Sequence, residues 1–309
     1  MEKLGKIAVI DLGTNTFHLL IVEYVNGLLH TIHKEKIPVK IGEGGIEEGL
    51  ITEAALARGI HTLQYFQTII KEHHITKVFA TATSAFRNAK NQHQIKDAIK
   101  IKTGLEIDII NGDEEAQLIY EGVRHAVKLD TRKHLIMDIG GGSVEFIICN
   151  SEEVFWKQSF EIGGQRLMTK FHNTDPIPKS SILELQDYLK DQLNSLKNAC
   201  AIYNPEILIG ASGSFDTLCE IYHKENGISF DLEKQTEYHL PFGVFHGIIE
   251  EIVSKDKDER LKIPGMIEMR VNMIVVACLL IEYVVDNHNI KEIISSTYAL
   301  KEGLVYRHI

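Results

Sequence analysis

The sequence predicts an α/β protein made of two related lobes, and two observations lead to this prediction. Short apolar runs alternate with stretches in which apolar residues recur every three or four positions, as strands alternate with helices. In addition, an apolar run that ends in an acidic residue and a glycine-containing turn occurs twice, at Asp11 and at Asp138. A repeated unit of this kind indicates two lobes with one architecture.

The first half of the chain begins with an expected hairpin. Residues 6–11 and 16–24 are rich in β-forming residues and flank a tight turn, so they predict two antiparallel strands. Thr52 precedes a stretch with apolar residues at helical spacing and is placed to cap that helix. The other elements expected in this half are strands at 28–40, 78–81 and 107–110 and helices at about 91–101 and 113–127.

The second half opens in the same way, with the Asp138 turn between two expected strands. Further on, Ser181 and Glu184 have the spacing of a capping box, which predicts a helix that starts near Ser181. The elements expected in this half are strands at 135–138, 144–149, 154–160, 206–209 and 292–295, and helices from about 181, after 210–214 and onward to Val285.

The boundary between the lobes has no obvious linker, because no stretch rich in proline, glycine or serine separates the halves. We place it within residues 127–132. The sequence thus predicts an N-terminal lobe of residues 1–127 and a C-terminal lobe of residues 128–298. The segment 299–309 is expected to pack back on the first lobe.

Composition narrows the possible functions. The chain has 309 residues with 33 Lys and Arg against 43 Asp and Glu, a net charge of −10, which argues against broad coating of nucleic acid. A small polyanion held in a local basic cleft stays possible. The longest apolar run, 274–285, contains Glu282 and is too short to span a bilayer, and residues 1–20 lack a signal-peptide core. We therefore expect a cytoplasmic protein with no membrane partner, and the four scattered cysteines predict reduced thiols.

The paired turns are the best indication of chemistry, because common phosphate and nucleophile motifs fail. The spacing of a Walker loop at 44–49 is followed by Leu50 instead of lysine, and 210–214 lacks the final glycine of a nucleophile elbow. A turn of glycine and hydroxyl residues can direct backbone N–H groups at a phosphate, and Asp11 and Asp138 could hold Mg²⁺ beside it. Either turn alone would more simply end a strand, but the duplication favours phosphate binding.

Two further segments carry candidate catalytic groups. The acids 113–115 follow an expected strand and begin an expected helix. One interpretation is that they cap the helix and interact favourably with its dipole. The other is that one carboxylate, Glu115, orients and deprotonates a water. Arg87 and Lys90 lie at the end of another strand, where they are either anion ligands or surface charges.

Four segments in order resemble the exopolyphosphatase/guanosine pentaphosphate phosphatase family. They are Asp11-Leu-Gly-Thr-Asn-Thr, Thr83-Ser-Ala-Phe-Arg-Asn-Ala, Gly112-Asp-Glu-Glu-Ala and Asp138-Ile-Gly-Gly-Gly-Ser-Val-Glu, and the match continues through 163–167, 210–214, 263–270 and 300–304. The resemblance implies the actin and sugar-kinase fold, two ribonuclease-H-like lobes with an interdomain active-site cleft, in its short two-lobe form.

The resemblance also implies an activity. Family members use Mg²⁺, with Mn²⁺ as an alternative, to hydrolyse the terminal phosphoanhydride of inorganic polyphosphate or the 5′ γ-phosphate of guanosine pentaphosphate, and homodimers are common among them. By position, it assigns catalysis to Glu115, metal binding to Asp11, Asp138 and Glu145, and phosphate binding to Gly13, Thr14, Asn15, Thr16, Arg87, Gly140, Gly141, Gly142, Ser143, Arg166 and Gly213.

Two other functions stay open at this point. A phosphotransferase or nucleotide-switched ATPase of the same superfamily could use 210–214 as an adenosine loop. A non-catalytic sensor of polyphosphate or an alarmone would bind without hydrolysis, but it would lack the acid that activates water, and Glu115 is present.

Because the net charge is −10, a polyanionic substrate must be attracted by local basic residues. The candidates are Lys36, Lys40, Arg87, Lys90 and Arg166.

Overall fold

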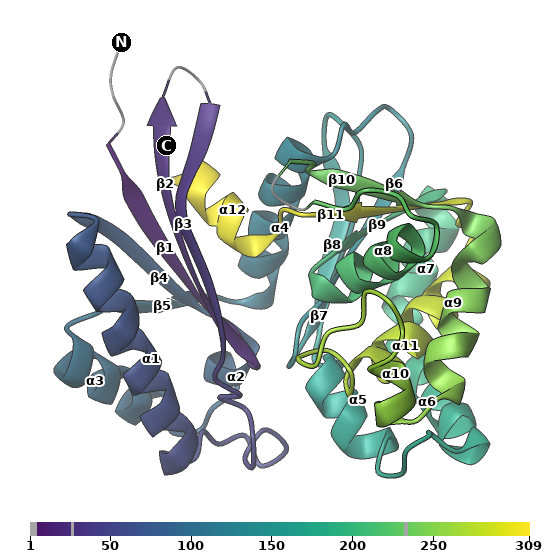
Figure 1. The fold of residues 1–309 in the computed structure, drawn as a ribbon, viewed down its shortest axis with the longest axis horizontal. Coiled ribbons are helices and arrows are strands. Elements are labelled where there is room, and N and C mark those ends of the chain that lie inside the picture. Colours follow the sequence, from purple (N-terminus) through teal and green to yellow (C-terminus); the bar gives the residue numbers. More distant parts are fainter. Residues whose placement is uncertain (1–4, 26–27, 232–233) are drawn as a thin grey trace. The chain divides into compact units, whose positions relative to one another are not determined.

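The structure is a computed structural model that describes residues 5–25, 28–231 and 234–309. The chain forms two compact units, Met1–Glu121 with Leu300–Ile309 and Gly122–Ala299. It passes from one unit to the other inside helix α4 (Gly112–Ala126). Each unit has a β-sheet of its own (Figure 1).

The first unit contains a five-stranded sheet in the order β3-β2-β1-β4-β5. The three strands of the expected hairpin region pair antiparallel, and the next two run parallel to β1. The bounds are Ile7–Leu12 for β1, Thr16–Val25 for β2, Leu28–Pro38 for β3, Lys77–Ala82 for β4 and Ile107–Ile109 for β5.

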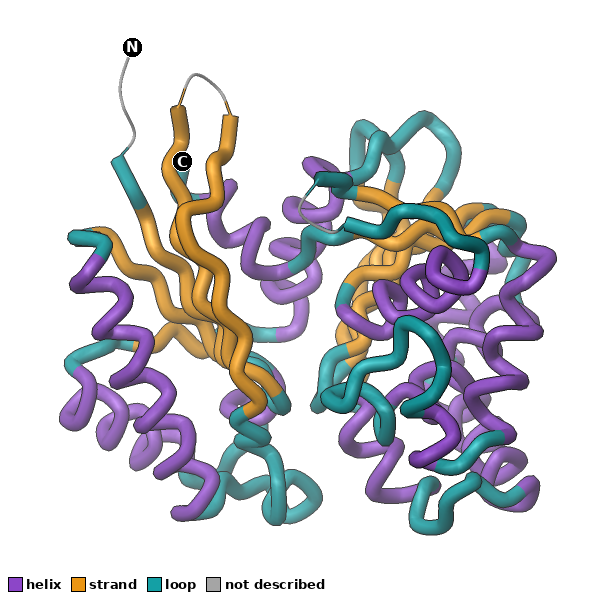
Figure 2. The backbone as a smooth tube through the Cα atoms, in the orientation of Figure 1, coloured by secondary structure: helices purple, strands orange, loops and turns teal. Residues whose placement is uncertain are grey.

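Helices cover both faces of this sheet (Figures 1 and 2). Ala8, Ile10 and Leu12 alternate along β1 and pack toward α1 and α3 in one apolar core. The opposite face of β1 lies against α12, which packs on β1 and β2. The helices of this unit, besides the start of α4, are α1 (Glu53–Glu72), α2 (Ser84–Arg87), α3 (Gln92–Thr103) and α12 (Leu300–Arg307).

The second unit repeats this topology. Its six-stranded sheet has the order β10-β11-β9-β6-β7-β8, and β8-β7-β6-β9-β11 has the same directions as β3-β2-β1-β4-β5. The repeat predicted from the two acid–glycine turns is therefore confirmed, and each unit has a ribonuclease-H-like sheet. The bounds are β6 His134–Ile139, β7 Val144–Cys149, β8 Val154–Phe160, β9 Ile207–Ala211, β10 Glu237–Leu240 and β11 Glu292–Ser296.

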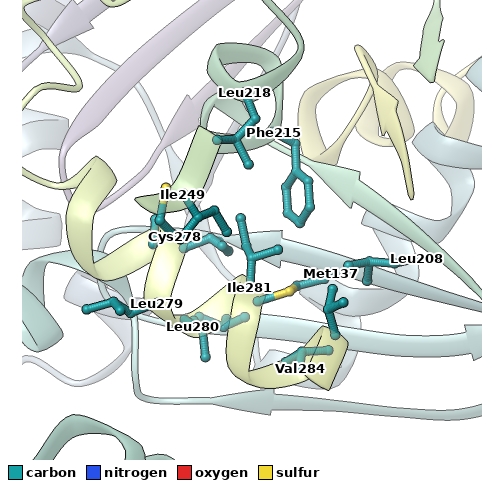
Figure 3. Packing of buried hydrophobic residues seen from close by; sticks show 14 of the residues in the cluster. Met137, Leu208, Phe215, Leu218, Ile249, Cys278, Leu279, Leu280, Ile281 and Val284 are labelled. Atoms are coloured by element: carbon teal, nitrogen blue, oxygen red, sulfur yellow. The ribbon is translucent and has the colours of Figure 1, made fainter. Parts of the chain in front are cut away.

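A large apolar core joins the second sheet to its helices. The near-continuous apolar sequence of α11 lets it be buried almost all round, and Ile281 and Val284 lie close to Met137 of β6 (Figure 3). The helices of this unit are α5 (Gly164–Phe171), α6 (Lys179–Gln192), α7 (Asn194–Tyr203), α8 (Gly213–Glu225), α9 (Phe242–Ser254), α10 (Lys257–Arg260) and α11 (Ile274–Asn287).

Local capping signals were right once and wrong once. The Thr52 hydroxyl oxygen accepts the N–H of Ala55 at 3.3 Å and caps α1, as predicted. The capping box at Ser181 is wrong, because α6 begins two residues earlier, after Pro178 at the N-cap position, and Ser181 lies inside its first turn. Of the helices formed by the described residues, none has both the length and the apolar character to cross a bilayer.

Candidate active site

In the first unit, a glycine turn follows the strand that carries Asp11. The N–H of Gly13 donates to the carbonyl of Thr16 at 3.1 Å and closes the turn. A Cβ at Gly13 would approach that carbonyl oxygen to 3.0 Å, so glycine keeps the turn tight. The loop after β3 holds the turn from outside, because the N–H groups of Lys40 and Gly42 donate to the carbonyls of Asn15 and Thr14 at 2.8 and 3.2 Å.

Arg87 and Glu115 form a direct ion pair in the same unit. Arg87 ends α2, Glu115 lies in the first turn of α4, and Nη1 of Arg87 is 2.7 Å from Oε2 of Glu115. The same nitrogen donates to the carbonyl of Ile110 at 3.3 Å. The Glu115 side chain is only 8% exposed, so its charge interacts with Arg87 largely out of water.

Asn111 and the two glutamates at the start of α4 have separate roles. The Asn111 side chain accepts the N–H of Glu114 at 2.9 Å and caps the helix. Glu114 itself pairs with Arg307 of α12 at 2.6 Å. Glu115 alone of the two glutamates joins Arg87. Capping therefore accounts for Asn111 and leaves Glu115 to a different role.

The turn of the second unit reproduces that of the first. The N–H of Gly140 donates to the carbonyl of Ser143 at 3.0 Å, as Gly13 does to Thr16. Backbone N–H groups at the start of α5 donate to the carbonyls of Gly140 and Gly141, both at 2.8 Å. Nε of Arg166, from α5, donates to the carbonyl of Gly142 at 3.0 Å. Arg166, expected as a phosphate ligand, thus also braces the turn in this structure.

Two carboxylates face each other beside this turn. Asp138 of β6 and Glu145 of β7 are directly opposite in the antiparallel register, so their side chains project from the same face. Both are buried, and the hydroxyl of Ser159 donates to Glu145 at 2.6 Å. Adjacent carboxylate oxygens are the hard donors that Mg²⁺ prefers, and a divalent cation would offset their repulsion. The pair therefore fits a magnesium site.

Arg270 is a charged group in this region that was assigned no role from its sequence pattern. Its guanidinium lies over Gly213, where a Cβ would overlap it, and it interacts with Asp138 and Asp216. Burial lowers the pKa of Arg270, while Asp216 and Asp138 raise it. Because arginine titrates far above neutral pH, the group stays a cation. An arginine preceding an apolar helix is too common a pattern to have identified it.

The segment 210–214, weighed as an adenosine loop, is partly filled by the protein's own groups. Arg270 covers Gly213, and the Ser212 hydroxyl donates to the carbonyl of Ile139 at 3.1 Å.

The structure brings together two sets of the expected site residues, each within its own unit. The first set is Asp11, Gly13, Thr14, Asn15 and Thr16 in one turn region with the Arg87–Glu115 pair in the same unit, and the second is Asp138, Gly140, Gly141, Gly142, Ser143, Glu145, Arg166 and Gly213.

Comparison with known proteins gives a consistent family. The model of the Ppx/GppA phosphatase family matches residues 20–309. A Haemophilus influenzae protein assigned as an exopolyphosphatase is 27% identical over 97% of this chain and 90% of its own length. The crystal structure of an exopolyphosphatase from Cytophaga hutchinsonii is 46% identical, with a TM-score of 0.95 over 98% of this chain and 97% of that one.

A more distant structure has the same fold. The Ppx/GppA family member of Aquifex aeolicus is 23% identical and superposes with a TM-score of 0.83 over 98% of this chain and 97% of that one. Because the family model covers most of the sequence, the chain belongs to the Ppx/GppA phosphatase family of phosphoanhydride hydrolases.

Proposed function

We propose that the protein is a Mg²⁺-dependent hydrolase that releases orthophosphate from the end of inorganic polyphosphate, from the 5′ end of guanosine pentaphosphate, or from both. The observation that carries this proposal is the buried pair of Glu115 with Arg87 at 2.7 Å. The pair places a carboxylate next to a cation. In-line attack of water on a phosphoryl group is assisted by a base that takes the proton of the water and by a cation that offsets the charge on the phosphoryl oxygens.

In this proposal Glu115 is the general base. It orients a water and takes its proton while the water oxygen forms a bond to the terminal phosphorus. The anhydride P–O bond breaks, and its electron pair leaves with the shortened chain. Arg87, whose guanidinium can donate several hydrogen bonds, holds the phosphoryl oxygens and offsets their developing charge.

Each glycine turn would bind phosphate oxygens through its own backbone N–H groups and hydroxyls, which are those of Thr14 and Thr16 in the first unit and of Ser143 in the second. In the second unit, Asp138 and Glu145 would hold Mg²⁺, or Mn²⁺ in its place, and Asp11 is the expected metal-binding carboxylate of the first unit. When bound, the metal would offset phosphate charge. Arg270 is a cation whose guanidinium lies over Gly213, and we expect it to attract anionic substrate.

Polyphosphate is the first substrate to test, since the Cytophaga hutchinsonii relative is called an exopolyphosphatase. Guanosine pentaphosphate is the second. A cytoplasmic location and a homodimer, both expected from the sequence and its family resemblance, are part of the same proposal.

The test compares adjacent glutamates. Phosphate release from medium-chain polyphosphate and from guanosine pentaphosphate is measured with Mg²⁺ and with excess chelator. We expect Glu115→Gln to lose at least about 100-fold in kcat, as for loss of a general base. The control is Glu114→Gln, at the residue next to Glu115, which alters only the pair with Arg307. Its kcat should stay within about 3-fold of the wild-type value.

Three other results would overturn the proposal. Equal activity of Glu115→Gln and wild type would remove Glu115 from catalysis. Binding of both substrates by the wild type without phosphate release would favour a sensor. Phosphorylated acceptor in place of free phosphate would indicate a phosphotransferase.

A further inference from the structure

An ion pair between Arg260 and Asp175 contacts the segment that carries Arg270. Arg260, the last residue of α10, is completely buried. Its Nη1 and Nη2 donate to Oδ1 and Oδ2 of Asp175 at 2.9 and 3.0 Å, a two-pronged contact. Asp175 belongs to the connection between α5 and α6, so this contact links stretches 85 residues apart in the sequence.

The same guanidinium also holds two backbone carbonyls. Nη1 donates to the carbonyl of Lys255, and Nε donates to the carbonyl of Val271 at 2.9 Å. Asp175 further accepts the N–H of Lys257 at 2.8 Å. One arginine thus fixes the α5–α6 connection, the start of α10 and the residue after Arg270 in a single arrangement. Lysine could not reproduce this fork of donors.

The backbone at Arg270 is held from both sides. Its N–H donates to the carbonyl of Ile267 at 3.0 Å, and its carbonyl accepts the N–H of Ile274 at 2.9 Å. A Cβ at Gly164, beside the 140–143 turn, would lie 3.0 Å from the Met273 side chain, so this segment packs closely on the start of α5. The position of the Arg270 guanidinium over Gly213 therefore depends on where Arg260 holds Val271.

We propose that Asp175 and Arg260 are positioning residues that keep the Arg270 guanidinium over Gly213 at the start of α8 and thereby set the affinity of the site for a phosphate-bearing substrate. This inference rests on the proposed function. Neither residue is assigned a contact with substrate. Both act through Arg270.

The alternative is that the pair only stabilises the fold. Buried ion pairs contribute little net stability compared with apolar side chains of similar volume, so stability alone is a weak reason for this one. A planar fork that binds one carboxylate and two carbonyls fixes geometry in a way that apolar packing does not. The two roles differ in kinetics, because lost positioning raises KM, whereas lost stability reduces the active fraction and hence the apparent kcat.

The test uses Asp175→Asn and Arg260→Lys in the full chain, with phosphate release from polyphosphate as the readout. We expect KM to rise about 10-fold, the effect of losing one charge-assisted contact, while kcat stays within about 3-fold. Leu196→Ala, a cavity in the buried side of α7, is the control for lost stability and should leave KM unchanged. If either charge variant fails to fold, Asp175→Glu keeps the charge and displaces it.

A double-mutant comparison makes the test specific. If Asp175 acts through Arg270, Asp175→Asn adds no further rise in KM in an Arg270→Ala background. Independent, multiplying effects would overturn the inference, as would a normal KM with a reduced kcat in Asp175→Asn.

Failure of the proposed function would be recognised separately. In that case the wild type releases no phosphate, and calorimetric binding of tripolyphosphate replaces KM as the readout. A weaker affinity of Asp175→Asn than of the wild type would then support the positioning role, and equal affinities would refute it.

Discussion

Neighbouring residues at the start of α4 have opposite surroundings. Glu114 pairs with Arg307, and Glu115 is buried against Arg87. The sequence predicted that both acids lie at the start of a helix, because the preceding strand, the polar turn and the helical spacing of the apolar residues are all local patterns. It could not show which one turns inward, since the partner Arg87 lies 28 residues away. Arg270 is a stronger case, because only the packing of its segment on α8 places it at the site.

Thiol reactivity tests the burial of single residues. Burial raises the pKa of Cys149 and of Cys200 to about 12, and it also raises the pKa of Cys219 and Cys278. Since the folded pKa lies above the unfolded value near 8.5, these thiols stay neutral and stabilise the fold below that pH, and this contribution is lost as pH rises toward 12.

We therefore expect the native protein to react with a thiol reagent at pH 8 at least about 100-fold more slowly than the unfolded chain. In guanidinium chloride all four thiols should react. A thiol that reacts within seconds in the native protein would contradict the buried positions.

At the scale of elements, local signals predicted the hairpins and the helices with a regular apolar period. The edge strand β10 was missed, because its four residues, 237–240, are held by pairing with β11, more than 50 residues later. The start of α6 was misplaced by two residues, because Ser181 lies inside the first turn of a helix whose N-cap residue is Pro178. Short elements that depend on distant partners leave little trace in the sequence.

The helix α12 provides the element-scale prediction. Leu304 is buried in the helix that packs on β1 and β2. Replacing it by alanine leaves a cavity, so Leu304→Ala should lower the free energy of unfolding by about 3 kcal/mol. Urea denaturation followed by circular dichroism measures this. Ile101→Ala, at a position that is 79% exposed on α3, is the control and should change stability by less than about 0.5 kcal/mol.

At the scale of the whole chain, the repeat of two acid–glycine turns was enough to predict two related α/β lobes. It worked because each turn must follow the same strand of the same sheet, so the repeated sequence reports a repeated topology. The roles of single residues were less visible. The role of Arg166 in phosphate binding stays a prediction, and its contact with the carbonyl of Gly142 could not be predicted, because that bond depends on the return of α5 to the turn.

The first unit consists of two separate segments of the chain, whereas the second is one continuous segment. Fragments that correspond to the two units should therefore differ in how cooperatively they unfold. Residues 122–299 contain the whole apolar core of the second unit, so this fragment should unfold cooperatively in urea. Residues 1–121 lack α12 and should not, unless 300–309 is joined to them by a flexible linker. Equal cooperativity of 1–121 with and without the added helix would contradict this.

The discontinuous first unit also has a consequence for biosynthesis. A ribosome makes β1 before residues 122–299, but it makes α12, the helix that covers one face of this strand, only after them. At typical elongation rates, all of 122–299 is translated in between, which takes roughly ten to forty seconds. Throughout that interval the apolar face beneath α12 lacks its native cover, so the nascent chain should be a client of ribosome-associated chaperones until α12 has left the ribosome and packed on β1.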